Sequence, residues 1–173
     1  DTTSKTPEDT VKVYNFDIAV DKYEGTKNES DTSKKLANAN FVLYKKVTEK
    51  GVETPYYYTR STTMTVTWNK DETAATTLTT DSFGKAAFTG LEKGTYYLRE
   101  TKAPDGYNKL KEDVRIEITN TLSDDGSMAT GGNAILDGNG HYVLTQPISN
   151  QAGAVLPSTG GIGTTIFYVL GLI

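Results

Sequence analysis

The stretch TYYLRETKAPDGY (95–107) decides the fold. Tyr96, Leu98 and Glu100 fall on alternate positions, which is the period of a strand with one buried face. The Pro and Asp-Gly steps of APDGY (103–107) then favour a turn. A strand rich in aromatic residues and Thr that ends in such a turn is typical of a protein built from antiparallel sheets.

Strand-like stretches recur on both sides of this segment, and none of useful length is helical. We expect strands at VKVYNFDIAVDKY (11–23), 39–47, 56–68 (one strand or two), 76–80, 85–89, 114–119 and 142–150, with loops at 24–35, 49–55, 69–75 and 121–140. This number of short strands predicts an all-β, Ig-like antiparallel β-sandwich over residues 11–150. Residues 1–10 are interpreted as a polar linker from an upstream region, and residues 151–173 as a separate C-terminal segment.

The composition excludes several classes of function. The 173 residues include no Cys and one His, so disulfides, zinc–thiolate sites, iron–sulfur clusters and thiol catalysis are excluded. The net charge of −4 argues against a nucleic-acid partner. The sequence therefore predicts no metal, no cofactor and no nucleic-acid binding.

Polar residues continue the apolar rows of three predicted strands. Lys22 follows an apolar row on the first strand, Glu100 follows Tyr96 and Leu98, and Asn150 follows a similar row on the last strand. An unpaired charge in a core is costly, so these side chains should meet one another or reach solvent.

Two questions about these residues stay open from periodicity alone. Each row can simply end with its polar residue at the rim of a sheet. Asn120 is also a rival to Asn150, because it follows Val114, Ile116 and Ile118 in phase.

Four stretches together resemble one family. GLEKGTYYLRETKAPDGY (90–107) looks like the E-box region of CnaB-type domains from Gram-positive pilins and surface adhesins. TDSFGKAAFTGL (80–91) is similar to the strand pair before it, and KKLANANFVLY (34–44) to the family's second strand. LPSTGG (156–161), followed by an apolar run, resembles a sortase sorting motif. The resemblance implies a CnaB-type sandwich followed by a flexible sorting segment.

The resemblance implies an internal isopeptide bond between Lys22 and Asn150, assisted by Glu100. The family's asparagine lies just before the sorting signal, which favours Asn150 over Asn120. Burial would make Lys22 a neutral nucleophile, and a protonated Glu100 would polarise the Asn150 carbonyl and carry a proton as ammonia leaves. Such a bond forms once per molecule, so the protein is not predicted to be an enzyme.

The sorting motif implies a second covalent linkage. By resemblance, a sortase recognises Leu156, Pro157, Ser158, Thr159 and Gly160 and cuts between Thr159 and Gly160. The Thr159 carbonyl then passes to a lysine of a neighbouring pilin subunit or to the cell-wall peptide. The apolar run Ile162–Ile173 has 12 residues, fewer than the roughly 20 of a membrane-spanning helix, and is interpreted as a truncated hydrophobic segment.

The resemblance favours a structural function outside the cell. We expect the C-terminal domain of a sortase-polymerised backbone pilin, in a pilus or anchored in the wall of a Gram-positive bacterium. The alternatives are an accessory pilin or the stalk of a wall-anchored adhesin, which would also contact host surface molecules. A backbone pilin usually carries an acceptor lysine in a "YPK" motif, but VKVYNF (11–16) has Asn15 after Tyr14 and no Pro-Lys step.

Overall fold

The computed structural model describes residues 16–25, 31–124 and 129–153. The predicted linker (1–10), the beginning of the first expected strand (11–15) and the sorting motif (156–161) lie outside these residues. Within them the chain forms β-strands joined by turns and two single-turn 3₁₀ helices, η1 (Thr32–Lys34) and η2 (Glu72–Ala74).

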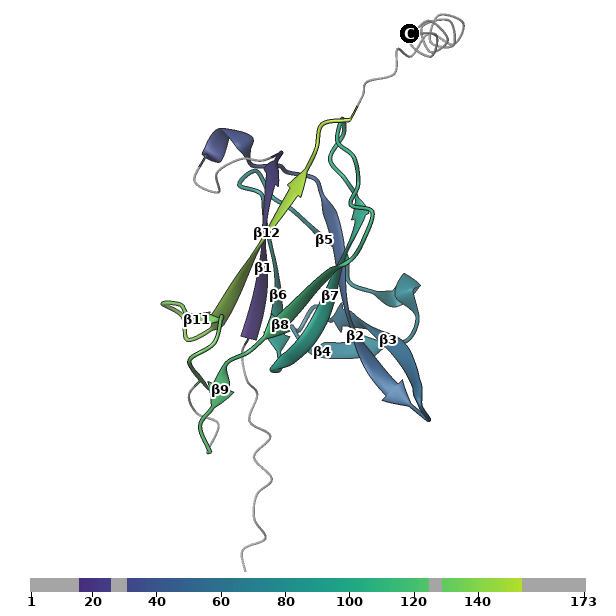
Figure 1. Cartoon of the computed structure of the whole chain (residues 1–173), viewed down its shortest axis with the longest axis vertical. Coiled ribbons are helices and arrows are strands. Elements are labelled where there is room, and N and C mark those ends of the chain that lie inside the picture. The colour runs from purple at the N-terminus through teal and green to yellow at the C-terminus, as the bar shows by residue number, and fades with distance from the viewer. Residues whose placement is uncertain (1–15, 26–30, 125–128, 154–173) are drawn as a thin grey trace, which may run out of the picture.

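Two sheets pack against each other (Figure 1). One sheet has the strand order β11 (Ile135–Leu136), β12 (Tyr142–Asn150), β1 (Phe16–Glu24) and β6 (Lys85–Leu91). The other has the order β4 (Val66–Asn69), β3 (Val52–Arg60), β2 (Asn40–Glu49), β7 (Gly94–Lys102) and β8 (Val114–Ile118), with β5 (Leu78–Thr79) paired to β2. A third, two-stranded sheet pairs β9 (Thr121–Leu122) with β10 (Ala129–Thr130), and Leu122 and Ala129 pack against the core. The predicted all-β sandwich is confirmed.

Two local expectations need correction, and the structure decides a third that was left open. The turn predicted over 49–55 comprises only Lys50 and Gly51, whose φ angles of 51° and 79° allow a tight reversal between β2 and β3. The stretch 56–68, predicted as one strand or two, contributes to two strands, β3 and β4. The loop predicted over 121–140 contains the short strands β9, β10 and β11.

One strand pair departs from the predicted antiparallel arrangement. β1 and β12 run parallel, with Lys22 opposite Ile148 and Glu24 opposite Asn150. Figure 1 shows the two strands side by side in the centre of the molecule, pointing the same way. Parallel neighbours must be joined by a long connection, and here nearly the whole domain provides it. The carboxyl ends of the first and last described strands therefore lie together.

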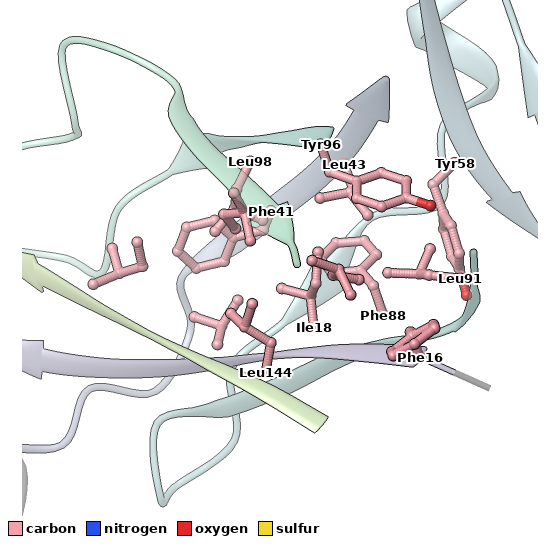
Figure 2. Packing of buried hydrophobic residues seen from close by; sticks show 14 of the residues in the cluster. Phe16, Ile18, Phe41, Leu43, Tyr58, Phe88, Leu91, Tyr96, Leu98 and Leu144 are labelled. Carbon is pink, nitrogen blue, oxygen red and sulfur yellow. The ribbon is translucent and has the colours of Figure 1, made fainter. Parts of the chain in front are cut away.

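The core fills the space between the two sheets. Figure 2 shows Phe16, Ile18, Phe88 and Leu144 of the β1 sheet facing side chains of the opposite sheet. The larger buried side chains of that opposite sheet are Phe41, Leu43, Tyr58, Tyr96 and Leu98. These apolar side chains exclude water from any polar group that lies between the sheets.

No helix among the described residues is long and apolar enough to cross a membrane.

Candidate functional site

Lys22 lies near the end of β1, with its side chain directed into the core. None of its surface is exposed, and its Nζ donates a hydrogen bond to the Ile148 carbonyl at 3.1 Å. Burial lowers the pKa of the Lys22 ammonium to about 8, although the negative charge of Glu100 opposes part of the shift. The amine is thus much easier to deprotonate than a surface lysine.

Glu100 reaches the same region from β7 of the opposite sheet. Its Oε2 accepts hydrogen bonds from Asn150 Nδ2 at 3.0 Å and from the Leu110 backbone N–H at 2.8 Å. Glu100 is 3% exposed and Asn150 is 1% exposed. Strands from both sheets thus bring a carboxyl group and an amide into contact, and place Lys22 within electrostatic reach of the carboxyl group.

Two acceptor atoms of this cluster lack a donor. Within the described part of the chain, Glu100 Oε1 and Asn150 Oδ1 are buried and have no hydrogen-bond partner. Unpaired buried oxygens are costly and rare, and a reactive role is one of the explanations for them. The cluster combines an amine, an amide carbonyl and a carboxyl group, which suffice for amide exchange between side chains.

Asn120, the rival asparagine, lies in a different environment. It is buried, and its amide binds the backbone of Ala134 twice: Nδ2 donates to the carbonyl at 2.8 Å and Oδ1 accepts from the N–H at 2.9 Å. These contacts fix the segment before β11, and both ends of the amide are occupied. These two hydrogen bonds therefore account for the burial of Asn120 without any bond to Lys22.

Two carboxylates on the outer face of β1 have partners that sequence reasoning missed. Asp17 Oδ2 lies 2.9 Å from His141 Nδ1; burial raises the pKa of Asp17, and the contact with His141 opposes this. Asp21 forms a buried ion pair with Lys35. Both aspartates lie on the face of β1 opposite the apolar row, and such a face is usually exposed to solvent. Periodicity therefore gave no indication that other segments cover them.

No group of three or more His, Cys, Asp or Glu side chains in the described ranges is placed to hold a metal ion.

The sequence of the described domain matches a known family. A family model described as "SpaA: Prealbumin-like fold domain" matches residues 21–130, more than half of the chain. The chain belongs to this SpaA family. The match includes Lys22 and Glu100 and ends before Asn150. It confirms the CnaB-type domain expected from the sequence.

Two solved structures similar to this SpaA domain are of pilus proteins. The pilus 2b backbone protein of group B streptococcus is 31% identical, with a TM-score of 0.57; the match covers 83% of this chain and 43% of that chain. The full-length major pilin RrgB of Streptococcus pneumoniae shares the fold at 17% identity and a TM-score of 0.52, covering 81% of this chain and 31% of that chain. The SpaA domain thus spans less than half the length of either. No curated protein matches the chain.

Proposed function

We propose that this SpaA domain is a structural part of a pilin, strengthened by a self-formed isopeptide bond between Lys22 and Asn150. The observation that carries the proposal is the buried Glu100–Asn150 hydrogen bond, within electrostatic reach of a lysine whose pKa is lowered to about 8. A buried amine, amide and carboxyl group are unfavourable as separate residues in a core. Condensation removes the amine charge and turns two costly groups into one neutral amide.

The reaction balances with Glu100 as the proton carrier. Glu100 takes a proton from the Lys22 ammonium, and the neutral Nζ attacks the Asn150 Cγ to form a C–N bond. The carboxyl group then gives a proton to the departing Nδ2, the Cγ–Nδ2 bond breaks and ammonia leaves. Nζ gives its second proton to the Glu100 carboxylate, which ends as a neutral carboxyl group, and the product is a secondary amide. No external reagent is needed, and the protein reacts once without turnover.

We further propose that the complete protein is a backbone pilin joined to its neighbours by a sortase through Thr159. The similarity to a streptococcal pilus backbone protein at 31% identity supports this role. The LPSTGG motif after β12 supports the linkage. A pilus or wall-anchored protein of a Gram-positive bacterium acts outside the cell, where a cysteine-free domain gains from another covalent cross-link.

Intact mass spectrometry tests the internal bond. The folded wild-type protein should weigh one ammonia less than its sequence, whereas Lys22→Ala and Asn150→Ala should retain the full sequence mass. Asn120→Ala is the matched control, because it removes a buried amide whose two ends are hydrogen-bonded to the backbone of Ala134. A wild-type protein of full mass would refute the bond. Ammonia loss in Asn150→Ala, together with full mass in Asn120→Ala, would make Asn120 the reacting residue.

The rate of bond formation should fall above about pH 8. The reactive pair is a neutral Lys22 amine and a protonated Glu100 carboxyl group. It carries the same single titratable proton as the ion pair of Lys22 ammonium and Glu100 carboxylate from which it forms. Above the pKa of Lys22, about 8, this proton is lost and none remains for the departing amide nitrogen. We expect a decline of about tenfold per pH unit beyond that point.

The measurement uses chain kept unfolded in denaturant, diluted into buffers of different pH, quenched at intervals and weighed. A rate that rises through pH 8 and stays high would mean that Glu100 supplies no proton.

A further inference from the structure

The backbone of Lys22 is held on one edge by segments other than a regular strand. β12 pairs with β1 along its whole length, but the pairing of β6 on the other edge extends only to Lys85, the first residue of β6, which lies opposite Asp21. At Lys22 two isolated contacts take over: its N–H donates to the Gly84 carbonyl at 2.8 Å, and its carbonyl accepts from the Leu36 N–H at 3.0 Å.

A buried ion pair adjoins the Leu36 contact. Lys35 Nζ lies 2.8 Å from Asp21 Oδ1 and 2.9 Å from Oδ2, and the two side chains are only 7% and 6% exposed. Asp21 precedes Lys22 in the chain and Lys35 precedes Leu36. The ion pair and the Leu36–Lys22 hydrogen bond therefore join the same two segments at consecutive residues.

The Leu36 segment is also fixed on its other side. The buried Thr80 hydroxyl donates to the Leu36 carbonyl at 2.8 Å and accepts from the Ala39 N–H at 3.0 Å. Gly84 packs closely against the same backbone: its φ is +73°, and a Cβ there would lie 2.3 Å from the Lys22 carbonyl oxygen. The backbone around Lys22 thus has little freedom to shift.

We propose that the Asp21–Lys35 ion pair positions Lys22 for attack on Asn150, an inference that rests on the proposed isopeptide bond. Buried ion pairs contribute little net stability, because desolvation offsets their attraction, but they can enforce one geometry. Here the pair holds Leu36 against the Lys22 carbonyl, at the point where β6 no longer supports β1. Misplacement of a reacting group by about 1 Å can cost on the order of a hundredfold in rate.

Lys35→Met and Lys85→Met form a matched pair of variants. Both remove one positive charge next to Asp21, since Lys85 Nζ lies 3.0 Å from Asp21 Oδ1. Lys35 directly precedes Leu36, whose contact with Lys22 lies outside any regular strand, whereas the backbone of Lys85 is already paired with β1 in the β6 ladder and its side chain is 48% exposed. After dilution from denaturant, Lys35→Met should lose ammonia at least about tenfold more slowly than wild type. Lys85→Met should react at close to the wild-type rate.

Two further measurements separate positioning from a general effect on charge or folding. The pH at which the rate declines should be the same in Lys35→Met and wild type, because the ion pair acts on geometry. Lys35→Arg should recover most of the rate, since a guanidinium can bind both carboxylate oxygens. The rate is expressed per folded molecule, with folding followed by Trp68 fluorescence. If Lys35→Met does not fold, Lys35→Gln and Lys85→Gln replace the pair.

The outcomes distinguish failure of the positioning role from failure of the proposed Lys22–Asn150 bond. A wild-type protein that keeps its full mass overturns the bond and the positioning role together. A wild type that loses ammonia, with Lys35→Met equally fast or Lys85→Met equally slow, overturns the positioning role alone. A displaced pH decline in Lys35→Met would show that Lys35 acts through its charge, and would overturn it as well.

Discussion

Replacing Glu100 with alanine should leave Lys22 and Asn150 unlinked in a folded sandwich, and the protein should keep its full sequence mass. The carboxyl group is the part of the cluster that contacts the Asn150 amide and can carry a proton between the reacting nitrogens. The bond would close a loop from residue 22 to residue 150. By analogy with disulfides, its absence should lower the free energy of unfolding by about 5 kcal/mol.

Denaturant unfolding of wild type, Glu100→Ala, Lys22→Ala and the double variant measures this loss. Because the loss comes from the missing bond, Glu100→Ala should cost far less in the Lys22→Ala background than in wild type. Glu100→Gln keeps the shape and an acceptor oxygen but carries no acidic proton, so it should also stay unlinked. Glu117→Gln, on the exposed face of β8, is the control and should lose ammonia normally. Full cross-linking of Glu100→Ala would show that the carboxyl group is dispensable.

Thr159→Ala should abolish polymer formation while leaving the internal bond intact. The two proposed linkages use different residues and different catalysts, since one forms within the folded core and the other needs a sortase. Coexpression with a pilin sortase, followed by electrophoresis in denaturant, should give a ladder of high-molecular-weight species for wild type and none for Thr159→Ala. Ser158→Ala, which changes the variable position of the motif, should still polymerise.

The combination of readouts separates the possible failures. A persistent ladder in Thr159→Ala would mean that another residue is the site of linkage. Loss of the internal bond in the same variant, detected by mass, would mean that the sorting segment contributes to the folding of the domain.

Alternation along single strands placed Lys22, Glu100 and Asn150 in phase with apolar rows, and the structure buries all three. A strand's two faces are set by parity alone, so Lys22, Glu100 and Asn150 could be assigned to the apolar face without knowledge of strand order. Parity could not separate Asn150 from Asn120, because both continue apolar rows. The distinction lies in their neighbours: one amide contacts Glu100, and the other is occupied by the backbone of Ala134.

Features that depend on contacts between distant segments could not be predicted from the sequence. The parallel direction of β1 and β12 is set by the route of the chain between them, which strand patterns do not encode. The burial of Asp21 was missed for the same kind of reason. Lys35 covers it from a polar stretch that resembles an ordinary loop.

The parallel pairing of β1 and β12 has a mechanical consequence. The chain enters this pair at Phe16 and leaves it at Asn150, at opposite ends of the two strands. Tension applied to the two ends of the domain therefore acts along the strands and shears their hydrogen bonds together, instead of separating them one by one. With the proposed bond in place, tension would pass from β1 through Lys22 into Asn150 and out of the domain. The six-stranded sheet would lie outside that path, and its loops could vary in sequence without weakening the connection between the two ends of the domain.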